Sequence, residues 1–123
     1  MSQEILEYKL RGYCCSQIVM AMGLERLGKE NKELVEAMGG LCFGMNQGRT
    51  CGIITAAMCL LQLADPVETE KRHAADFINW FEDVFGSAEC RELLEGNPLN
   101  KAEKCPQMLD AAFKQISELL EWD

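Results

Sequence analysis

Cysteine is the residue type whose number and spacing in this chain could carry out chemistry. Seven cysteines stand at positions 14, 15, 42, 51, 59, 90 and 105 of a 123-residue sequence. An odd number cannot all pair within one chain, and a reducing compartment keeps structural disulfides open. The reactive form of cysteine, both for thiol exchange and for metal binding, is the thiolate. What each cysteine can do therefore depends on where the fold places it.

Four cysteines are predicted at or just inside the N-termini of helices: Cys15, Cys51, Cys90 and Cys105. Cys105 is expected to be the N-cap residue of a helix that begins at Pro106. The unpaired N–H groups and partial positive charge of a helix N-terminus lower the pKa of a thiol and so stabilise its thiolate. We therefore predict these four as redox residues or, in an alternative interpretation, as four ligands of a metal ion or an iron–sulfur cluster.

Basic residues adjoin the same four cysteines in the sequence, which is a weaker signal because 12 of the 123 residues are basic. They are Arg11, Arg49, Arg91 and Lys104.

The other three cysteines have less definite roles. Cys59 falls in the middle of a predicted buried helix, so we expect it to fill space in the core and to react only after unfolding. For Cys42, on the apolar face of a helix, packing and function are about equally favoured. Cys14 is either a partner of Cys15 or simply its neighbour, so the roles of Cys14 and Cys42 stay open.

A run of glycines precedes the central cysteine. Gly40, Gly44, Gly48 and Gly52 repeat at every fourth position, although each glycine in a helix costs about 1 kcal/mol relative to alanine. We predict that the backbone at Gly48 and Gly52 lets a cofactor or substrate come close to Cys51. Close packing of helices through small residues explains the same glycines equally well.

The elements that must position these residues are all predicted to be helices. Apolar residues recur at helical spacing, and Asp65-Pro66 begins one helix while Gly96-Asn97-Pro98 ends another. His73 is expected to be a surface or boundary residue. The predicted helices span about 2–11, 15–27, 31–42, 51–64, 66–85, 87–95 and the chain from 106 onward. This pattern predicts a single all-α domain over residues 1–123, a compact bundle of about five to six helices.

Composition excludes several classes of partner. The chain has 12 basic and 20 acidic side chains and a net charge of −8, which argues against binding to nucleic acid or to an anionic membrane. Its first residues do not resemble a signal peptide, and its longest apolar stretch, 53–63, is far shorter than the roughly 20 residues that span a bilayer. We expect a cytoplasmic protein. The sequence also lacks a CxxC pair, a CxxCH haem motif and a phosphate-binding loop.

Four segments carry a resemblance to a known family: "CCSQIVMA", "GGLCFGMNQGRTCGIITAA", "FGSAECRELL" and "KCPQMLDAA". They are spread over most of the chain, from residue 14 to residue 112, and they resemble the cysteine segments of the C_GCAxxG_C_C family of small redox-active proteins. The resemblance implies that Cys15, Cys51, Cys90 and Cys105 are the family's cysteines. The chain departs from the CGAxxG motif at Ile53 and Ala56, where the motif has alanine and glycine. A related domain in cytochromes of anaerobic bacteria has been considered for an iron–sulfur role.

Three functions follow from these patterns. The first is redox chemistry by clustered thiolates, through thiol–disulfide exchange or electron transfer, with an unidentified redox partner. The second is binding of a metal ion or an iron–sulfur cluster by the four family cysteines. The third is a helical interaction module whose cysteines are merely buried. No motif requires the protein to be an enzyme, although the first function would make it similar to a thiol–disulfide oxidoreductase. The sequence leaves a homo-oligomer open.

Overall fold

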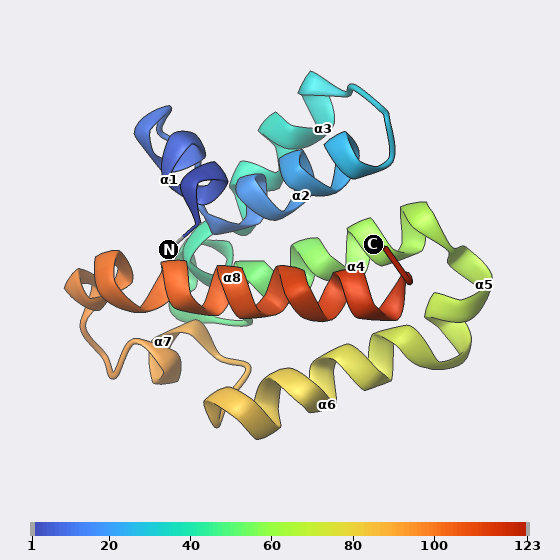
Figure 1. Ribbon diagram of the computed structural model, residues 1–123. Helices are drawn as coiled ribbons and strands as arrows, with labels where there is room; N and C mark the ends of the chain where they lie inside the picture. The colour runs from blue at the N-terminus through green and yellow to red at the C-terminus, as the bar shows by residue number, and fades with distance from the viewer. Residues whose placement is uncertain (1, 123) are drawn as a thin grey trace.

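Helices joined by short turns make up the computed structural model, which describes residues 2–122 (Figure 1). The α-helices are α1 (Gln3–Leu10), α2 (Cys15–Arg26), α3 (Lys32–Ala37), α4 (Gly52–Ala64), α5 (Pro66–Glu68), α6 (Ala74–Phe85), α7 (Cys90–Leu93) and α8 (Lys101–Leu119). Short 3-10 helices cover Met38–Leu41 (η1) and Pro98–Asn100 (η4), and a π-helical turn covers Thr69–His73 (η3). Gly44–Gly48 (η2) is an irregular turn, because Met45 and Asn46 have left-handed backbone angles.

The all-α prediction is confirmed, because the described residues form no strand, only an isolated bridge between Thr50 and Glu89. Since α5, η3 and α6 follow one another without a break, the residues from Pro66 to Phe85 run as one helix, as the sequence predicted. Counted in this way there are seven helices, slightly more than the five to six expected.

Helix α4 lies at the centre of the fold, with α2 against one side and α8 and α6 against the other (Figure 1). The residues of α4 that face these helices are buried: Gly52, Ile53, Ile54, Ala56, Ala57, Leu60 and Leu61. Gly23 of α2 lies directly against Leu60, where even one added carbon would collide with the leucine side chain. This close approach of α2 and α4 brings the N-terminal ends of the two helices together.

Helix α8 begins earlier than predicted. The sequence Asn97-Pro98, expected to end one helix, in fact begins the next. The Asn97 side chain accepts a hydrogen bond of 3.0 Å from the Leu99 N–H, and Pro98 occupies the first helical position. A side-chain cap followed by proline is a strong start signal, because proline lacks the N–H that would otherwise be unpaired there. Pro106 therefore lies inside α8, and Cys105 is not an N-cap residue.

The third predicted helix, 31–42, is shorter than expected. Helix α3 ends at Ala37, η1 follows, and Cys42 has extended backbone angles (φ −61°, ψ 142°). Gly39 and Gly40 adjoin this change of conformation, where glycine lowers helix propensity.

Two residues have a different exposure from the one predicted. Cys59 is exposed, because Cys59, Gln62 and Leu63 lie on a face of α4 that no other helix covers. His73 is buried, with only 3% of its surface exposed. It ends the π turn η3, and a π turn adds one residue to a helical turn and so shifts the residues that face the core. Among the helices within residues 2–122, none has both the length and the apolar character needed to cross a bilayer.

Candidate functional site

One cavity of about 240 Å³ brings the predicted site cysteines together. Five cysteines line it: Cys14, Cys15, Cys51, Cys90 and Cys105. They come from α2, α4, α7 and α8 or from the residues that precede these helices. Residues separated by up to about ninety positions in the chain therefore line one cavity. The redox role predicted for the four family cysteines remains a prediction, but their common location is a feature of the fold.

A short backbone pairing places Cys51 beside Cys90. The Cys51 N–H donates to the Ala88 carbonyl at 2.8 Å, and the Cys90 N–H donates to the Arg49 carbonyl at 2.7 Å. These two bonds hold the chain just before α4 against the chain just before α7, so the two helices begin side by side. Both side chains are buried, with exposed fractions of 5% and 7%.

Cys15 and Cys105 meet from different helices. Cys15 is the first residue of α2, and Cys105 is the fifth residue of α8. Both side chains line the cavity. A hydrogen bond donated by the Cys15 thiol, which keeps its proton, favours the thiolate form of Cys105.

This hydrogen bond is the main reason why the pKa of Cys105 falls from the ordinary 9.0 to about 7. Burial works in the opposite direction, and the positive charges of Lys9 and Lys101 add to the lowering. About half of the Cys105 side chains are therefore thiolate at neutral pH. The same bond, together with burial, raises the pKa of Cys15 well above its ordinary value.

The other two family cysteines hold their protons more tightly. Burial raises the pKa of Cys51 to about 12, even though hydrogen bonds from the N–H groups of Ile53 and Ile54 lower it. Burial also raises the pKa of Cys90. The direction of the pKa shift at Cys105 agrees with the prediction, but its cause is not the expected helix N-terminus, and the shifts at Cys15, Cys51 and Cys90 have the opposite direction. At the N-terminus of α4 the helix amides act as expected, but removal from water outweighs them.

The basic residues that act on the cavity are not the sequence neighbours of the cysteines. Lys9 comes from α1, and Lys101 lies one helical turn before Cys105 in α8. By contrast, Lys104 forms an ion pair with Glu95 at 3.0 Å and donates to the Leu93 carbonyl at 3.3 Å. The spacing of four residues between Lys101 and Cys105 puts both on one helix face. That signal was present in the sequence, but it was hidden by the wrong start assigned to α8.

The glycine run mainly allows close backbone packing. A Cβ at Gly52 would lie 2.7 Å from the carbonyl oxygen of Leu41, and a Cβ at Gly44 would collide with the Arg49 backbone. Gly48, with φ +68°, lies against the Arg91 side chain and outside the cavity wall, whereas Gly52 is part of that wall. Arg91 itself donates to the Gln47 carbonyl at 3.0 Å. The structure thus gives both glycines a packing reason, and the predicted approach of a cofactor stays a prediction.

Four cysteine thiolates are a donor set that suits zinc or an iron–sulfur cluster. Within residues 2–122, however, no three cysteine, histidine, aspartate or glutamate side chains are grouped closely enough to hold one metal ion. The cysteines share a cavity without forming a ligand cage. We therefore derive no chemical step through a metal.

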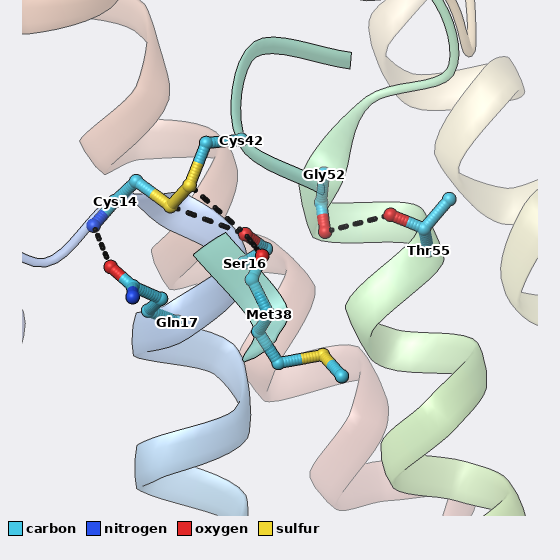
Figure 2. The surroundings of a disulfide bond; sticks show 7 residues. All are labelled: Cys14, Ser16, Gln17, Met38, Cys42, Gly52 and Thr55. Atoms are coloured by element: carbon cyan, nitrogen blue, oxygen red, sulfur yellow. Dashed lines mark hydrogen bonds between the residues drawn. A yellow bond between two sulfur atoms is a disulfide. The ribbon is translucent and has the colours of Figure 1, made fainter. Parts of the chain in front are cut away.

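The structure also joins two cysteines whose roles the sequence left open. Cys14 and Cys42 form a disulfide, with Cα atoms 6.0 Å apart and a sequence separation of 28 (Figure 2). The bridge connects the N-cap of α2 to the residue that follows η1. Neither residue belongs to the four-cysteine pattern, and no spacing rule in the sequence pointed to this pair.

A known protein family matches this chain. Residues 13–119 match the family described as "Putative redox-active protein (C_GCAxxG_C_C)". The match covers most of the chain, so the chain belongs to this family. The comparisons with curated proteins and with solved structures found no match.

Proposed function

We propose that this protein is a thiol–disulfide redox protein in which Cys15 and Cys105 are the exchanging pair. The observation that carries the proposal is that these two side chains line one cavity, where interaction with Cys15 helps to lower the pKa of Cys105 to about 7. An attacking thiol works best when its pKa is close to the ambient pH, because it is then both ionised and nucleophilic. Cys15, still protonated, is placed to act second.

The exchange takes place in two steps. The Cys105 thiolate attacks one sulfur of a partner disulfide, a mixed disulfide forms, and the other partner sulfur leaves as a thiolate. That thiolate accepts the proton of Cys15, whose own thiolate then attacks the Cys105 sulfur. The second partner sulfur leaves, and a Cys15–Cys105 disulfide remains. Two electrons have passed from the protein to its partner. The same two steps in reverse order oxidise a partner dithiol.

The surroundings of the pair favour this order of events. The charges of Lys9 and Lys101 stabilise the Cys105 thiolate, and the raised pKa values of Cys51 and Cys90 keep those thiols neutral beside it. Two further thiolates in the same cavity would repel the first one. A reducing compartment such as the cytoplasm would return the pair to thiols between reactions.

Disulfide mapping tests the proposal directly. The double variant Cys14→Ser/Cys42→Ser is suitable, because the tryptic peptide 12–26 carries both Cys14 and Cys15 and the variant leaves only Cys15 there. After reduction and treatment with glutathione disulfide, we expect peptide 12–26 to be linked to peptide 105–114, and the link to be lost on reduction. Adding Cys105→Ser should abolish the link, whereas adding Cys59→Ser, at the exposed face of α4, should leave it intact. A protein that links only Cys51 to Cys90, or forms no link, would contradict the proposal.

A further inference from the structure

We infer that the Cys14–Cys42 disulfide is a second redox couple, which exchanges with the Cys15–Cys105 pair inside the same molecule. The inference rests on the proposed function, since it assigns to Cys105 a second disulfide to attack. It gives a role to two cysteines that lie outside the four-cysteine pattern of the family.

The position of Cys14 makes the exchange accessible. Cys14 lines the same cavity as Cys15 and Cys105, whereas Cys42 does not. Its backbone is fixed as the N-cap of α2, where its N–H donates to the Gln17 side-chain oxygen at 3.1 Å (Figure 2). A thiolate that approaches from the cavity therefore attacks the Cys14 sulfur, and the Cys42 sulfur is the leaving group.

Ser16 supplies a polar group at the leaving sulfur. Its side chain is fully buried, and its oxygen lies 3.2 Å from the Cys14 sulfur and 3.4 Å from the Cys42 sulfur (Figure 2). Its proton is donated to the Met38 carbonyl at 2.7 Å in the disulfide form. A rotation about one bond turns that proton toward Cys42, because a hydroxyl hydrogen rotates to suit its partners. A buried thiolate released at Cys42 thus has a hydrogen-bond donor within reach.

The exchange balances within the protein. The Cys105 thiolate attacks the Cys14 sulfur, a Cys14–Cys105 disulfide forms, the Cys14–Cys42 bond breaks, and Cys42 leaves as a thiolate. Cys15 transfers its proton to that thiolate and attacks the Cys105 sulfur, which releases the Cys14 thiolate. The Cys15–Cys105 pair has lost two electrons, and the Cys14–Cys42 pair has gained them. No external oxidant or reductant is consumed in the transfer.

Trapping the intermediate tests this route. The variant Cys15→Ser removes the thiol of the second step and leaves Cys14 as the only cysteine in peptide 12–26. Protein that holds the Cys14–Cys42 disulfide and a free Cys105 thiol is incubated without oxygen or added oxidant at mildly alkaline pH, quenched with acid and digested. We expect peptide 12–26 linked partly to peptide 33–49, which carries Cys42, and partly to peptide 105–114. The control Cys15→Ser/Cys105→Ser should give only the link to 33–49.

A second substitution tests the role of Ser16. In the Cys15→Ser background, Ser16→Ala should slow the appearance of the 12–26 to 105–114 link by about tenfold, because the leaving thiolate loses its hydrogen-bond donor. The circular dichroism spectrum shows whether Cys15→Ser is folded. If it is not, the wild-type protein is used instead, and the free Cys42 thiol should appear at the same rate as the Cys15–Cys105 link.

The result that overturns the inference is a folded Cys15→Ser protein whose Cys105 reacts with iodoacetamide while peptide 12–26 stays linked to 33–49 alone. This outcome leaves the proposed function standing. A different result would contradict the proposed function. That result is the absence of a Cys15–Cys105 link in the Cys14→Ser/Cys42→Ser variant.

Discussion

At the scale of single residues, two cysteines in one cavity ionise in opposite ways. The pKa of Cys105 is about 7, while that of Cys51 is about 12. Both side chains are buried, and burial alone raises both values. The difference comes from the partners of Cys105, which are the Cys15 thiol and the two lysines. Nucleophilic character in this cavity is therefore decided by contacts between elements and not by helix position alone.

The lysine charges can be tested one at a time. We predict that Lys101→Met and Lys9→Met each raise the pKa of Cys105 and slow its alkylation at pH 7 by about two- to threefold, because a nearby positive charge is lost. Lys104→Met is the matched control. Lys104 is the sequence neighbour of Cys105, but it is engaged with Glu95 and the Leu93 carbonyl, so its removal should change the rate little. Rates in the presence of iodoacetamide are measured by mass spectrometry of the tryptic peptide that carries Cys105, which is 105–114 except in Lys104→Met, where the lost cleavage site makes it 102–114. A larger effect at Lys104 than at Lys101 would show that our assignment of the charges is wrong.

At the scale of elements, the sequence singled out four of the five cysteines that line the cavity but not how each is held. The positions of Cys15 and Cys51 at helix starts were visible from nearby breaks in the pattern. The place of Cys105 was not, because Asn97-Pro98 is compatible both with the end of one helix and with the start of the next. The contribution of Lys9 could not be found at all, since it depends on how α1 packs beside α8. Such contacts have no local signature.

The start of α4 depends on one glycine. Because a Cβ at Gly52 would lie 2.7 Å from the Leu41 carbonyl oxygen, we predict that Gly52→Ala destabilises the fold by about 1–3 kcal/mol. Gly40→Ala is the matched control from the same glycine run. A Cβ there has no neighbour within 4 Å, so its effect should stay within about 0.5 kcal/mol. Urea denaturation gives both values. Equal effects at the two positions would contradict the close backbone contact.

At the scale of the whole molecule, the helical pattern predicted the fold class but not which faces are covered. Helix α4 is apolar almost all round, which predicted burial of Cys59. The fold leaves that face open. His73 has the opposite outcome, because a π turn that no sequence rule anticipates turns it toward the core. Which faces of a helix are buried depends on how the helices pack around one another. The periodicity of a single sequence does not contain that information.

The ionisation of Cys105 should also be visible in global stability. Its pKa is lower in the folded protein than the ordinary 9.0, so between about pH 7 and 9 the unfolded chain binds more protons at this group. Its contribution is then fully present above pH 9 and is lost as the pH falls through 7. We predict that the loss of unfolding free energy caused by Cys105→Ser grows as the pH rises from 7 to 9, in urea titrations under reductant. Cys59→Ser, at an exposed position, should show no such trend. A loss that stays constant with pH would mean that Cys105 ionises alike in the folded and unfolded chains.

The most direct test of the central claim is the pH profile of alkylation at Cys105 in the fully reduced wild-type protein. The rate at each pH is read from peptide 105–114, which contains no other cysteine. If Cys105 is the thiolate partner of Cys15, the profile has its midpoint near pH 7, in line with the pKa of about 7. A midpoint at pH 9 or above would show that Cys105 is an ordinary buried thiol and would contradict the proposed redox pair.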